Sequence, residues 1–344
     1  MYTLSICIAT LNRAHFITQM LDSILDQITP DCEIVVLDCA STDGTEIAVR
    51  AYAERFNSVR YIRQDSNNGI DRDYDRVVTL AAGTYCWLMS DDDTIKPGAL
   101  KCVLEALTRD YSVVLVNAEV CTNDMTEIIK RRWANVDGRR VYVPTEADLL
   151  FRHAGHLLEY IGCVVIKRDM WLVREKERYY GSLMIHIGII FQSRLPGPAL
   201  LIGDPLVRYR GGNTNTYLND LFELAMVRMP RLVDSLALAE ETKRNFCIME
   251  PWKRPMALLF YRALGVYSVA EYARWIEPRL SRKWQSLLPY LIAIAPGVAV
   301  NTLYVLCYAI AHRGRFSHFP RLIASRFCIL KSHDTSPPRS LGHH

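Results

Sequence analysis

The sequence predicts an α/β protein in which helices cover a largely parallel sheet. Over the first 120 residues, short runs rich in β-branched residues alternate with segments of helical periodicity. Two of these runs end abruptly in polar turns, as strands of such sheets do. The composition, 50% hydrophobic and 23% charged over 344 residues, excludes a disordered or collagen-like chain and allows a large buried core.

Four strands are expected in this region, each followed by a helix. The strands are Leu4–Ala9, Glu33–Asp38, Val59–Arg63 and Tyr85–Met89. The first helix is predicted by the i, i+4 spacing of Phe16, Met20, Ile24 and Ile28. Asp43 and Glu46 have the spacing of a capping box, which predicts that the second helix begins there. The other two helices are expected over about residues 71–82 and after Pro97.

Beyond residue 120 the periodicity is weaker and predicts a mixed α/β stretch followed by helices. Strands are expected near 160–167 and 200–209, and helices over 221–241 and 256–275. The expected divisions are a domain over 1–218 with halves 1–118 and 119–218, a helical extension over 219–278, a basic apolar segment over 279–331 and a disordered tail over 332–344.

The ten cysteines form no Cys-x-x-Cys pair, and several lie in apolar, strand-like runs, which is typical of reduced, buried thiols. Near the N-terminus, Leu4–Ala9 is too short for the apolar core of a signal peptide and has no basic leader. We therefore expect the bulk of the chain to be cytosolic.

Three adjacent carboxylates, Asp91, Asp92 and Asp93, follow the fourth expected strand. Ligands of open α/β sheets bind beyond the carboxyl ends of the strands, so this position favours a binding site. The carboxylates repel one another unless a cation neutralises them, and their oxygens suit Mg²⁺ or Mn²⁺ with a substrate phosphate completing the shell. The alternative is a solvated acidic turn that caps the helix after Pro97.

Four motifs follow one another in register over about a third of the chain. They are Leu4–Arg13 with Ser23–Gln27, Glu33–Thr45, Asn68–Arg72 and Ala82–Asp93. In order and spacing they resemble four motifs of family 2 glycosyltransferases. The first two resemble the "PTYNR" turn with "SIxxQ" and the "EIIVVDDGSTDGT" segment. The third resembles the segment that approaches the nucleotide and diphosphate, and the fourth resembles "AxGxYIxFLDxDD". The resemblance implies the GT-A fold, which is Rossmann-like and binds nucleotide sugars, and a glycosyltransferase activity of EC class 2.4.

The resemblance also implies roles for individual residues. The implied nucleotide-sugar-binding residues are Thr10, Asn12, Arg13, Asp38, Asn68, Gly69, Arg72, Asp91 and Asp92. The implied metal ligands are Asp91, Asp92 and Asp93, with Mn²⁺ or Mg²⁺ as the cofactor. Asp38 would hydrogen-bond the base and Arg72 would face the diphosphate; the alternatives are a helix cap and a surface helix residue.

Three departures from the family motifs leave the nucleotide open. Ala9 replaces Pro, Leu11 replaces Tyr, and Cys39-Ala40 replace Asp-Gly. The loss of the Tyr removes a ring on which a base could stack.

The catalytic base is also open, because the family's Glu-Asp pair ahead of an "LxxR" segment is not found. An inverting transfer needs a base for the acceptor hydroxyl, and the candidates are His186, Glu159 and Asp204. His186 lies in an apolar run, so a hydrogen-bonded core residue is the alternative. Leu158–Arg168, His186 and Pro205–Asn213 resemble more loosely the abequosyltransferase-type branch, which adds dideoxyhexoses to lipid-linked O-antigen precursors.

The net charge of +4 conceals a basic segment. Residues 279–331 contain eight basic and no acidic residues, so the rest of the chain has 33 basic against 37 acidic ones. Leu287–Ala311 is apolar but is broken at Pro296-Gly297 into limbs of roughly 20 Å, too short for a hydrocarbon core of about 30 Å. We expect a re-entrant or interface-lying hairpin on an anionic membrane surface; the alternative is a soluble subdomain or oligomer interface. Nucleic-acid binding is not expected, because the basic residues flank an apolar run.

Together these features predict a metal-dependent, inverting glycosyltransferase, peripheral or monotopic, at the cytoplasmic face of the plasma membrane. It would transfer a sugar from a nucleotide diphosphate sugar to a hydroxyl of a polyprenyl-linked saccharide, in O-antigen-like polysaccharide assembly. The alternatives are a catalytically silent GT-A scaffold that binds nucleotide and a protein partner, and a soluble glycosyltransferase with a dimerising tail.

Overall fold

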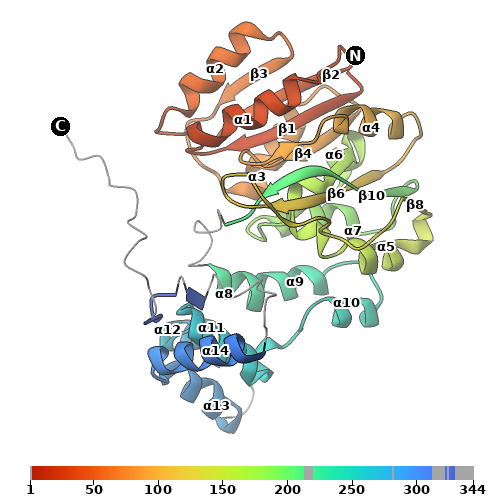
Figure 1. Cartoon of the computed structure of the whole chain (residues 1–344). Helices are drawn as coiled ribbons and strands as arrows, with labels where there is room; N and C mark the ends of the chain where they lie inside the picture. Colours follow the sequence, from red (N-terminus) through yellow and green to blue (C-terminus); the bar gives the residue numbers. More distant parts are fainter. Residues whose placement is uncertain (1, 213–219, 281–282, 312–321, 324, 330–344) are drawn as a thin grey trace, which may run out of the picture. The chain divides into compact units, whose positions relative to one another are not determined.

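The computed structural model describes residues 2–212, 220–280, 283–311, 322–323 and 325–329, which fall into two compact units (Figure 1). The first unit comprises Met1–Asn215 and Arg231–Cys247, and the second Thr216–Pro230 and Ile248–His344. Several predicted features lie outside the described residues, namely the tail over 332–344, Asn213, Arg282, Arg313, Arg315, Arg321 and Lys331.

A ten-stranded sheet, counted over the described residues, forms the centre of the first unit. Its strand order is β3-β2-β1-β4-β9-β6-β10-β5, with β7 paired to β6 and β8 to β10. The strands are β1 (Leu4–Thr10), β2 (Cys32–Asp38), β3 (Val59–Arg63), β4 (Tyr85–Met89), β5 (Thr94–Ile95), β6 (Val113–Cys121), β7 (Ile128–Lys130), β8 (Arg139–Tyr142), β9 (Val164–Lys167) and β10 (Ala199–Arg210). The β1–β4 layer is parallel, β9 is antiparallel to β4 and β6, and β6 is parallel to β10. The α/β fold class and the four N-terminal strands are therefore confirmed.

The helices of this unit lie around the sheet, and some pack directly on it. They are α1 (Ala14–Leu25), α2 (Thr45–Arg55), α3 (Ile70–Leu80), α4 (Ala99–Ala106), α5 (Ala147–Ala154), α6 (Arg168–Val173), α7 (Ile185–Phe191) and α10 (Glu240–Phe246). In α1 the buried side chains are Ile17, Met20, Leu21 and Ile24, at the spacing that predicts the helix. The helix α3 packs on β1 and β2, and α2 packs on β2 and β3. This alternation brings the turn after each strand to the same edge of the sheet.

Asp43 does not cap α2 in the expected way. Gly44 occupies the N-cap position, and no side chain caps the helix. Asp43 Oδ1 instead accepts a hydrogen bond from the Thr45 N–H at 2.9 Å, and its Oδ2 accepts one from the Ala14 N–H at 3.2 Å. The predicted capping box is therefore wrong, because Asp43 connects the β2–α2 turn with the start of α1.

The region beyond residue 120 contains more short elements than its weak periodicity predicts. The strand expected from residue 160 begins at Val164, because two 3-10 turns, Leu157–Glu159 and Ile161–Cys163, precede it. Residues 231–247 belong to the first unit and not to a separate extension. The Ala237 N–H donates to the Phe191 carbonyl at 2.8 Å, and the Phe246 ring packs 4.7 Å from that of Phe151.

The second unit is helical. Its elements are α8 (Leu221–Glu223), a π turn (Leu224–Arg228), the start of α9 (Met229–Asp234), a 3-10 turn (Pro251–Lys253), α11 (Pro255–Leu264), α12 (Val269–Glu271), a second π turn (Tyr272–Ile276), a 3-10 turn (Glu277–Arg279), α13 (Lys283–Ile294) and α14 (Gly297–Ala311). One core cluster gathers Phe222, Met226, Val227, Leu258, Tyr267, Tyr272, Ile276, Ile292 and Ala293. The helix α11 packs against both α13 and α14.

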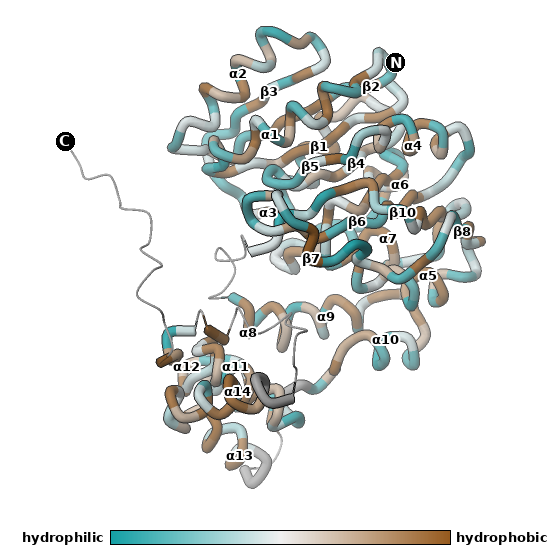
Figure 2. Tube along the Cα trace, viewed as in Figure 1, coloured by the Kyte–Doolittle hydropathy of each residue, from teal (hydrophilic) through white to brown (hydrophobic). Residues whose placement is uncertain are grey.

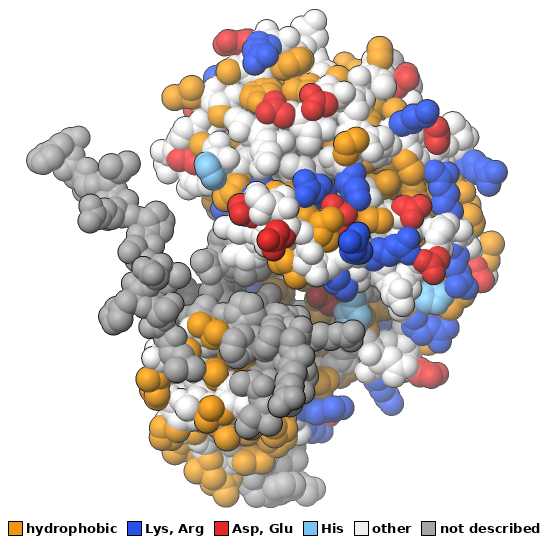
Figure 3. Space-filling view, viewed as in Figure 1, with side chains coloured by type: hydrophobic (Ala, Val, Ile, Leu, Met, Phe, Trp, Pro, Cys, Tyr) orange, Lys and Arg blue, Asp and Glu red, His pale blue; other side chains and the backbone are white. Residues whose placement is uncertain are grey.

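The apolar hairpin of this unit breaks where the sequence predicts, between α13 and α14. Within the described part of the chain, no single helix is long and apolar enough to cross a bilayer. Ser286–Ile294 and Gly297–Cys307 meet those requirements only as a pair, bent by 92°. Figure 2 shows hydrophobic residues along α11 and α14, and Figure 3 shows hydrophobic side chains gathered on the visible surface of this unit.

The ten cysteines are all free thiols, and seven of them are buried. This agrees with the expectation of reduced thiols.

Candidate active site

The carboxyl ends of β1, β2 and β4 meet at one edge of the sheet. In the register of the parallel strands, Thr10 lies opposite Asp38, and Ile8 lies opposite Met89. The turns after these strands therefore converge, and they carry most of the residues that the sequence predicts for the nucleotide site.

The turns after β1 and β2 are hydrogen-bonded to each other. The Asn12 N–H donates to Ser41 Oγ at 2.9 Å, and Asn12 Oδ1 accepts from the Thr42 N–H at 2.8 Å. Asn12 has φ 55° and Ala40 has φ 67°, so both adopt the left-handed conformation. Asn tolerates this conformation, whereas Ala40 is strained where the family motif has Gly. Asn12 therefore fixes the shape of the site, and the Thr10 side chain is buried beneath it.

Asp38 is fully buried, and both of its oxygens have partners within the chain. Oδ1 accepts from the Ser41 N–H at 2.7 Å. Oδ2 accepts from the Tyr61 hydroxyl at 2.7 Å and from Arg63 Nη1 at 3.2 Å. Burial and the bond to Asp38 raise the pKa of Tyr61 well above its ordinary value. The structure thus gives Asp38 a positioning role in the β2 turn, and its contact with a base stays a prediction.

Within the acidic triplet, the three carboxylates have different surroundings. Asp91 is 9% exposed and lies 3.4 Å from Arg13 Nε. Asp93 is 1% exposed; its Oδ1 accepts from the Arg210 N–H at 2.6 Å, while its Oδ2 has no hydrogen-bond partner. Asp92 is only half-buried and accepts from Ser90 Oγ at 2.6 Å.

The triplet carries more negative charge than its surroundings stabilise. Burial first, and then the neighbouring Asp92, raise the pKa of Asp91 to about 6. The same two causes raise the pKa of Asp93 to about 8. Two carboxyl groups with raised pKa values at one edge of a sheet are typical of a functional site.

Arg210, at the end of β10, holds the triplet from the other side. Its Nε donates to the Asp92 carbonyl at 2.7 Å, and its Nη2 donates to Gln19 Oε1 at 2.6 Å. Its guanidinium also reaches the Asn123 carbonyl and lies 4.8 Å above the Phe16 ring. In the sequence, Arg210 belongs only to the segment that loosely resembles the abequosyltransferase-type branch, and it is not among the predicted site residues. The local sequence does not indicate that β10 ends beside β4.

On α3, Arg72 is held by a segment that follows α6. Its Cζ lies 4.1 Å from the centre of the Tyr180 ring, whose hydroxyl donates to Asp75 Oδ2 at 2.7 Å. Asp71 accepts from the Leu183 and Ile185 N–H groups at 2.9 and 3.0 Å. Arg72 itself is exposed near the start of α3.

Asn68 and Gly69 form the turn before α3. Gly69 has φ 88°, which glycine adopts without strain, and Asn68 is exposed. Both residues therefore lie beside Arg72, as the motif implies.

His186 lies in the protein core, which corrects its expected role as the base. It is 1% exposed, and its Nε2 lies 2.6 Å from the Leu158 carbonyl, so this nitrogen must carry the hydrogen. Burial lowers the pKa of His186 to about 4. A neutral ring that is sealed in this way cannot reach an acceptor hydroxyl.

The two carboxylate candidates are both accessible. Glu159 is 41% exposed, and its Oε1 lies 2.8 Å from His156 Nδ1. The bond to Glu159 raises the pKa of His156. Asp204 is 70% exposed and lies 3.4 Å from Arg132 Nη2. Glu159 is the one adjacent in sequence to Tyr160, a residue of the site.

An aromatic cluster that the sequence does not predict adjoins the triplet. The Trp133 ring stacks 5.8 Å from Tyr160 and lies edge-on 4.9 Å from Tyr209. Tyr160 is buried, and burial followed by the charge of Asp93 raises its pKa. Trp133 and Tyr209 are half-buried, and Trp133 Nε1 donates to the His156 carbonyl at 2.9 Å. The cluster thus connects the triplet with the Glu159–His156 pair.

Over the described residues, no three His, Cys, Asp or Glu side chains converge tightly enough to hold a metal ion unaided. Any cation at the triplet would need further oxygen ligands from a substrate or from water.

A parallel β1–β4 layer that ends in a buried acidic triplet beside paired polar turns defines a glycosyltransferase of the GT-A fold. The profile of the family described as "Glycosyl transferase family 2" matches residues 5–174. Abequosyltransferase RfbV of Salmonella typhimurium is 30% identical over 223 residues, which cover 61% of this chain and 67% of that protein. The chain belongs to glycosyltransferase family 2.

Two solved structures agree with the fold. TarS of S. aureus in complex with UDP has a TM-score of 0.55 at 15% identity, covering 90% of this chain and 87% of that one. The mannosyltransferase PcManGT from Pyrobaculum calidifontis, in complex with GDP-Man and Mn²⁺, has a TM-score of 0.54 at 16% identity, covering 94% and 85%. Both are similar in fold to this chain.

Proposed function

We propose that the chain transfers a sugar, in one inverting displacement, from a nucleotide diphosphate sugar to a hydroxyl of a polyprenyl-linked saccharide. The reaction would take place in cell-surface polysaccharide assembly of the O-antigen type. The observation that carries the proposal is the acidic triplet, in which Asp93 Oδ2 is buried without a partner and burial and Asp92 raise the pKa of both Asp91 and Asp93.

The triplet fits a divalent cation. Its donors are all carboxylate oxygens, the chemistry that Mn²⁺ and Mg²⁺ prefer, and the unpaired Oδ2 of Asp93 lacks a positive partner. Asp92 and Asp93 would hold the cation, with Asp91 beside them. When bound, such a cation stabilises the charge on a departing diphosphate. The complexes of TarS with UDP and of PcManGT with GDP-Man and Mn²⁺ support a donor of this class.

The residues around the triplet would bind and orient the donor. Arg72, exposed near the start of α3, would contribute positive charge toward the diphosphate. Arg13 would hold Asp91 ionised, because the two form an ion pair. The fixed turns of β1 and β2 would orient the nucleotide, and orientation supplies much of the rate in a two-substrate transfer.

The acceptor would bind on the Trp133 side of the triplet. The half-buried faces of Trp133 and Tyr209 offer an apolar platform for a sugar ring. Glu159 would take the proton of the acceptor hydroxyl as that oxygen attacks the anomeric carbon, with His156 orienting the carboxylate. This arrangement replaces His186 as the base.

The enzyme would work at the cytoplasmic face of the plasma membrane as a peripheral or monotopic protein. The bent, apolar α13–α14 pair and the basic composition of residues 279–331 support this location. The name of RfbV supports a deoxysugar donor, and the base of the nucleotide stays open.

A calorimetric screen of CDP, UDP, GDP and dTDP with Mn²⁺ tests the proposal directly. We expect one of the four to bind tightly, and Asp92→Asn to abolish the Mn²⁺-dependent part of that binding. Binding of none of them would contradict a nucleotide-sugar donor. Nucleotide binding without turnover of any donor, with or without acceptor, would support the catalytically silent scaffold instead.

A further inference from the structure

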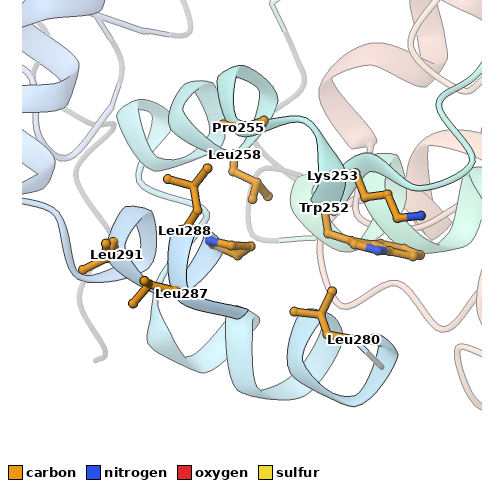
Figure 4. A pocket seen from close by; sticks show the side chains of 9 residues that line it. Trp252, Lys253, Pro255, Leu258, Leu280, Leu287, Leu288 and Leu291 are labelled. Atoms are coloured by element: carbon orange, nitrogen blue, oxygen red, sulfur yellow. The ribbon is translucent and has the colours of Figure 1, made fainter. Parts of the chain in front are cut away.

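The second unit contains an apolar cavity that the proposed reaction does not use. It has a volume of about 470 Å³ and lies among α11, α13 and the turn before α11 (Figure 4). Its lining residues are Trp252, Lys253, Pro255, Leu258, Leu280, Leu287, Leu288, Pro289 and Leu291. Lys253 is the one charged residue among them.

The cavity is large and open enough for part of a hydrocarbon chain. With about 30 Å³ for a group of the size of a water molecule or a methylene, it holds on the order of 15 such groups. Leu287, Leu288 and Leu291 line it and are each about half exposed, so the cavity opens to the surface of the unit. Protein interiors are close-packed, and apolar walls that face water are unfavourable. An apolar ligand would remove these apolar side chains from contact with water.

Trp252, which lines the cavity, lies beside basic side chains. The Arg279 guanidinium lies 5.9 Å from the Trp252 ring and 5.6 Å from the Trp275 ring. Lys253 Nζ lies 2.5 Å from Glu250 Oε2, so its charge is shared with one exposed carboxylate. Arg254 follows Lys253 and is exposed. Basic groups around an apolar cavity suit a chain that ends in an anionic phosphate.

We propose that this cavity binds the isoprenoid chain of a polyprenyl phosphate, with the phosphate toward Lys253 and Arg279. The inference rests on the proposed function, because it assigns a binding site to the lipid part of the acceptor. A bilayer surface would cover the exposed leucines but would not fill a concave cavity. One isoprenoid chain would cover the leucines and also fill the cavity.

Farnesyl phosphate titrated into the full chain, followed by tryptophan fluorescence, tests the inference. Leu287→Gln places an amide in the cavity and should weaken binding by about tenfold. Leu303→Gln is the matched control, because Leu303 is 60% exposed against 61% for Leu287 and does not line the cavity. Farnesol should bind more weakly than farnesyl phosphate, and Lys253→Ala should reduce that difference.

Equal binding of farnesyl phosphate by the wild type and Leu287→Gln would overturn the inference. Equal weakening by Leu287→Gln and Leu303→Gln would also overturn it, because it would indicate general adhesion to lipid. A straight-chain alkyl phosphate that binds as tightly would assign the cavity to membrane acyl chains. A change of mass in light scattering with Leu287→Gln alone would assign it to a second copy of the chain.

Nucleotide binding separates this inference from the proposed function. Leu287→Gln should bind the nucleotide and Mn²⁺ as the wild type does. Loss of farnesyl phosphate binding with intact nucleotide binding therefore concerns the cavity alone, whereas failure of nucleotide binding in the wild type concerns the reaction.

Discussion

The Arg210 N–H donates to Asp93 Oδ1 at 2.6 Å, and the Arg210 side chain donates to the Asp92 carbonyl, so the last residue of β10 fixes the acidic turn after β4. The two residues are 117 positions apart in the chain. The shape of the candidate metal site therefore depends on a contact between the two halves of the first unit.

Arg210→Met should destabilise the protein by about 1–3 kcal/mol, because it removes the part-buried hydrogen bonds that the buried Arg210 side chain donates to the Asp92 carbonyl, Gln19 Oε1 and the Asn123 carbonyl. Urea unfolding measures this loss. Nucleotide affinity in the presence of Mn²⁺ should fall as well. Arg140→Met, at an exposed position of β8, is the control and should change stability by less than about 0.5 kcal/mol. Equal effects of the two substitutions would contradict the assigned role of Arg210.

The triplet should make stability depend on pH when divalent cations are absent. The folded pKa values of Asp91 and Asp93, about 6 and about 8, lie above the ordinary 3.8. The folded state therefore holds protons that the unfolded state has released, so these two groups should lower the free energy of unfolding as pH rises from about 4 to about 8, with Asp93 alone contributing above about pH 6. Chemical unfolding in EDTA measures the slope, and Asp93→Asn should flatten it. Added Mn²⁺ should stabilise the wild type most at the higher pH; a pH-independent effect of Mn²⁺ would argue against binding at the triplet.

His186 should affect acid stability and not catalysis. Its folded pKa of about 4 lies below the ordinary 6.5, so the unfolded state binds the extra proton first and the His186 contribution to stability is lost as pH falls from about 6.5 to about 4. Asp91 and Asp93 contribute with the opposite sign in this range, so the loss is measured as the difference between the wild type and His186→Gln. The shift corresponds to about 3 kcal/mol. In His186→Gln this loss should be absent, while kcat at neutral pH stays within about threefold of the wild type. A loss of kcat of several orders of magnitude, with the fold intact by circular dichroism, would restore His186 as the base.

Ala40→Gly should stabilise the protein by about 0.5–1 kcal/mol. Ala40 has φ 67°, which costs a residue with a Cβ more than it costs glycine. Thermal unfolding measures the gain. Ala48→Gly, within α2, is the control and should destabilise by about 1 kcal/mol, because there glycine loses more backbone entropy than alanine.

The N-terminal half of the fold could be predicted because its signals are local. β1, β2 and β4 are short, mostly apolar runs, and the acidic triplet follows β4 directly. The break at Pro296-Gly297 is likewise a local signal. These features need no knowledge of distant residues.

The parts that could not be predicted depend on pairings between distant segments. Arg210 reaches Asp93 only because β10 pairs with β5, which follows the triplet, and with β6. The rings of Trp133, Tyr160 and Tyr209 pack together although the three residues lie in separate segments of the chain. A histidine in an apolar run is more often a hydrogen-bonded core residue than a catalytic base, and the contact of His186 with the Leu158 carbonyl supports a core position.

The assignment of Glu159 as the base gives the sharpest test of the reaction. Glu159→Gln keeps the size of the side chain but removes its basicity, so kcat should fall by about 100-fold or more while the affinity for nucleotide and Mn²⁺ stays unchanged. Asp204→Asn is the matched control, because Asp204 is also an exposed carboxylate held by a basic partner, and its kcat should stay near that of the wild type.

His156→Gln adds a second measurement, because in the proposed reaction His156 acts by orienting Glu159. It should lower kcat less than Glu159→Gln does, and the double variant should be no slower than Glu159→Gln alone, since the two residues act as one unit. NMR of the product should show the anomeric configuration inverted relative to the donor. Retention of configuration, or an Asp204→Asn variant as slow as Glu159→Gln, would contradict a single displacement with Glu159 as its base.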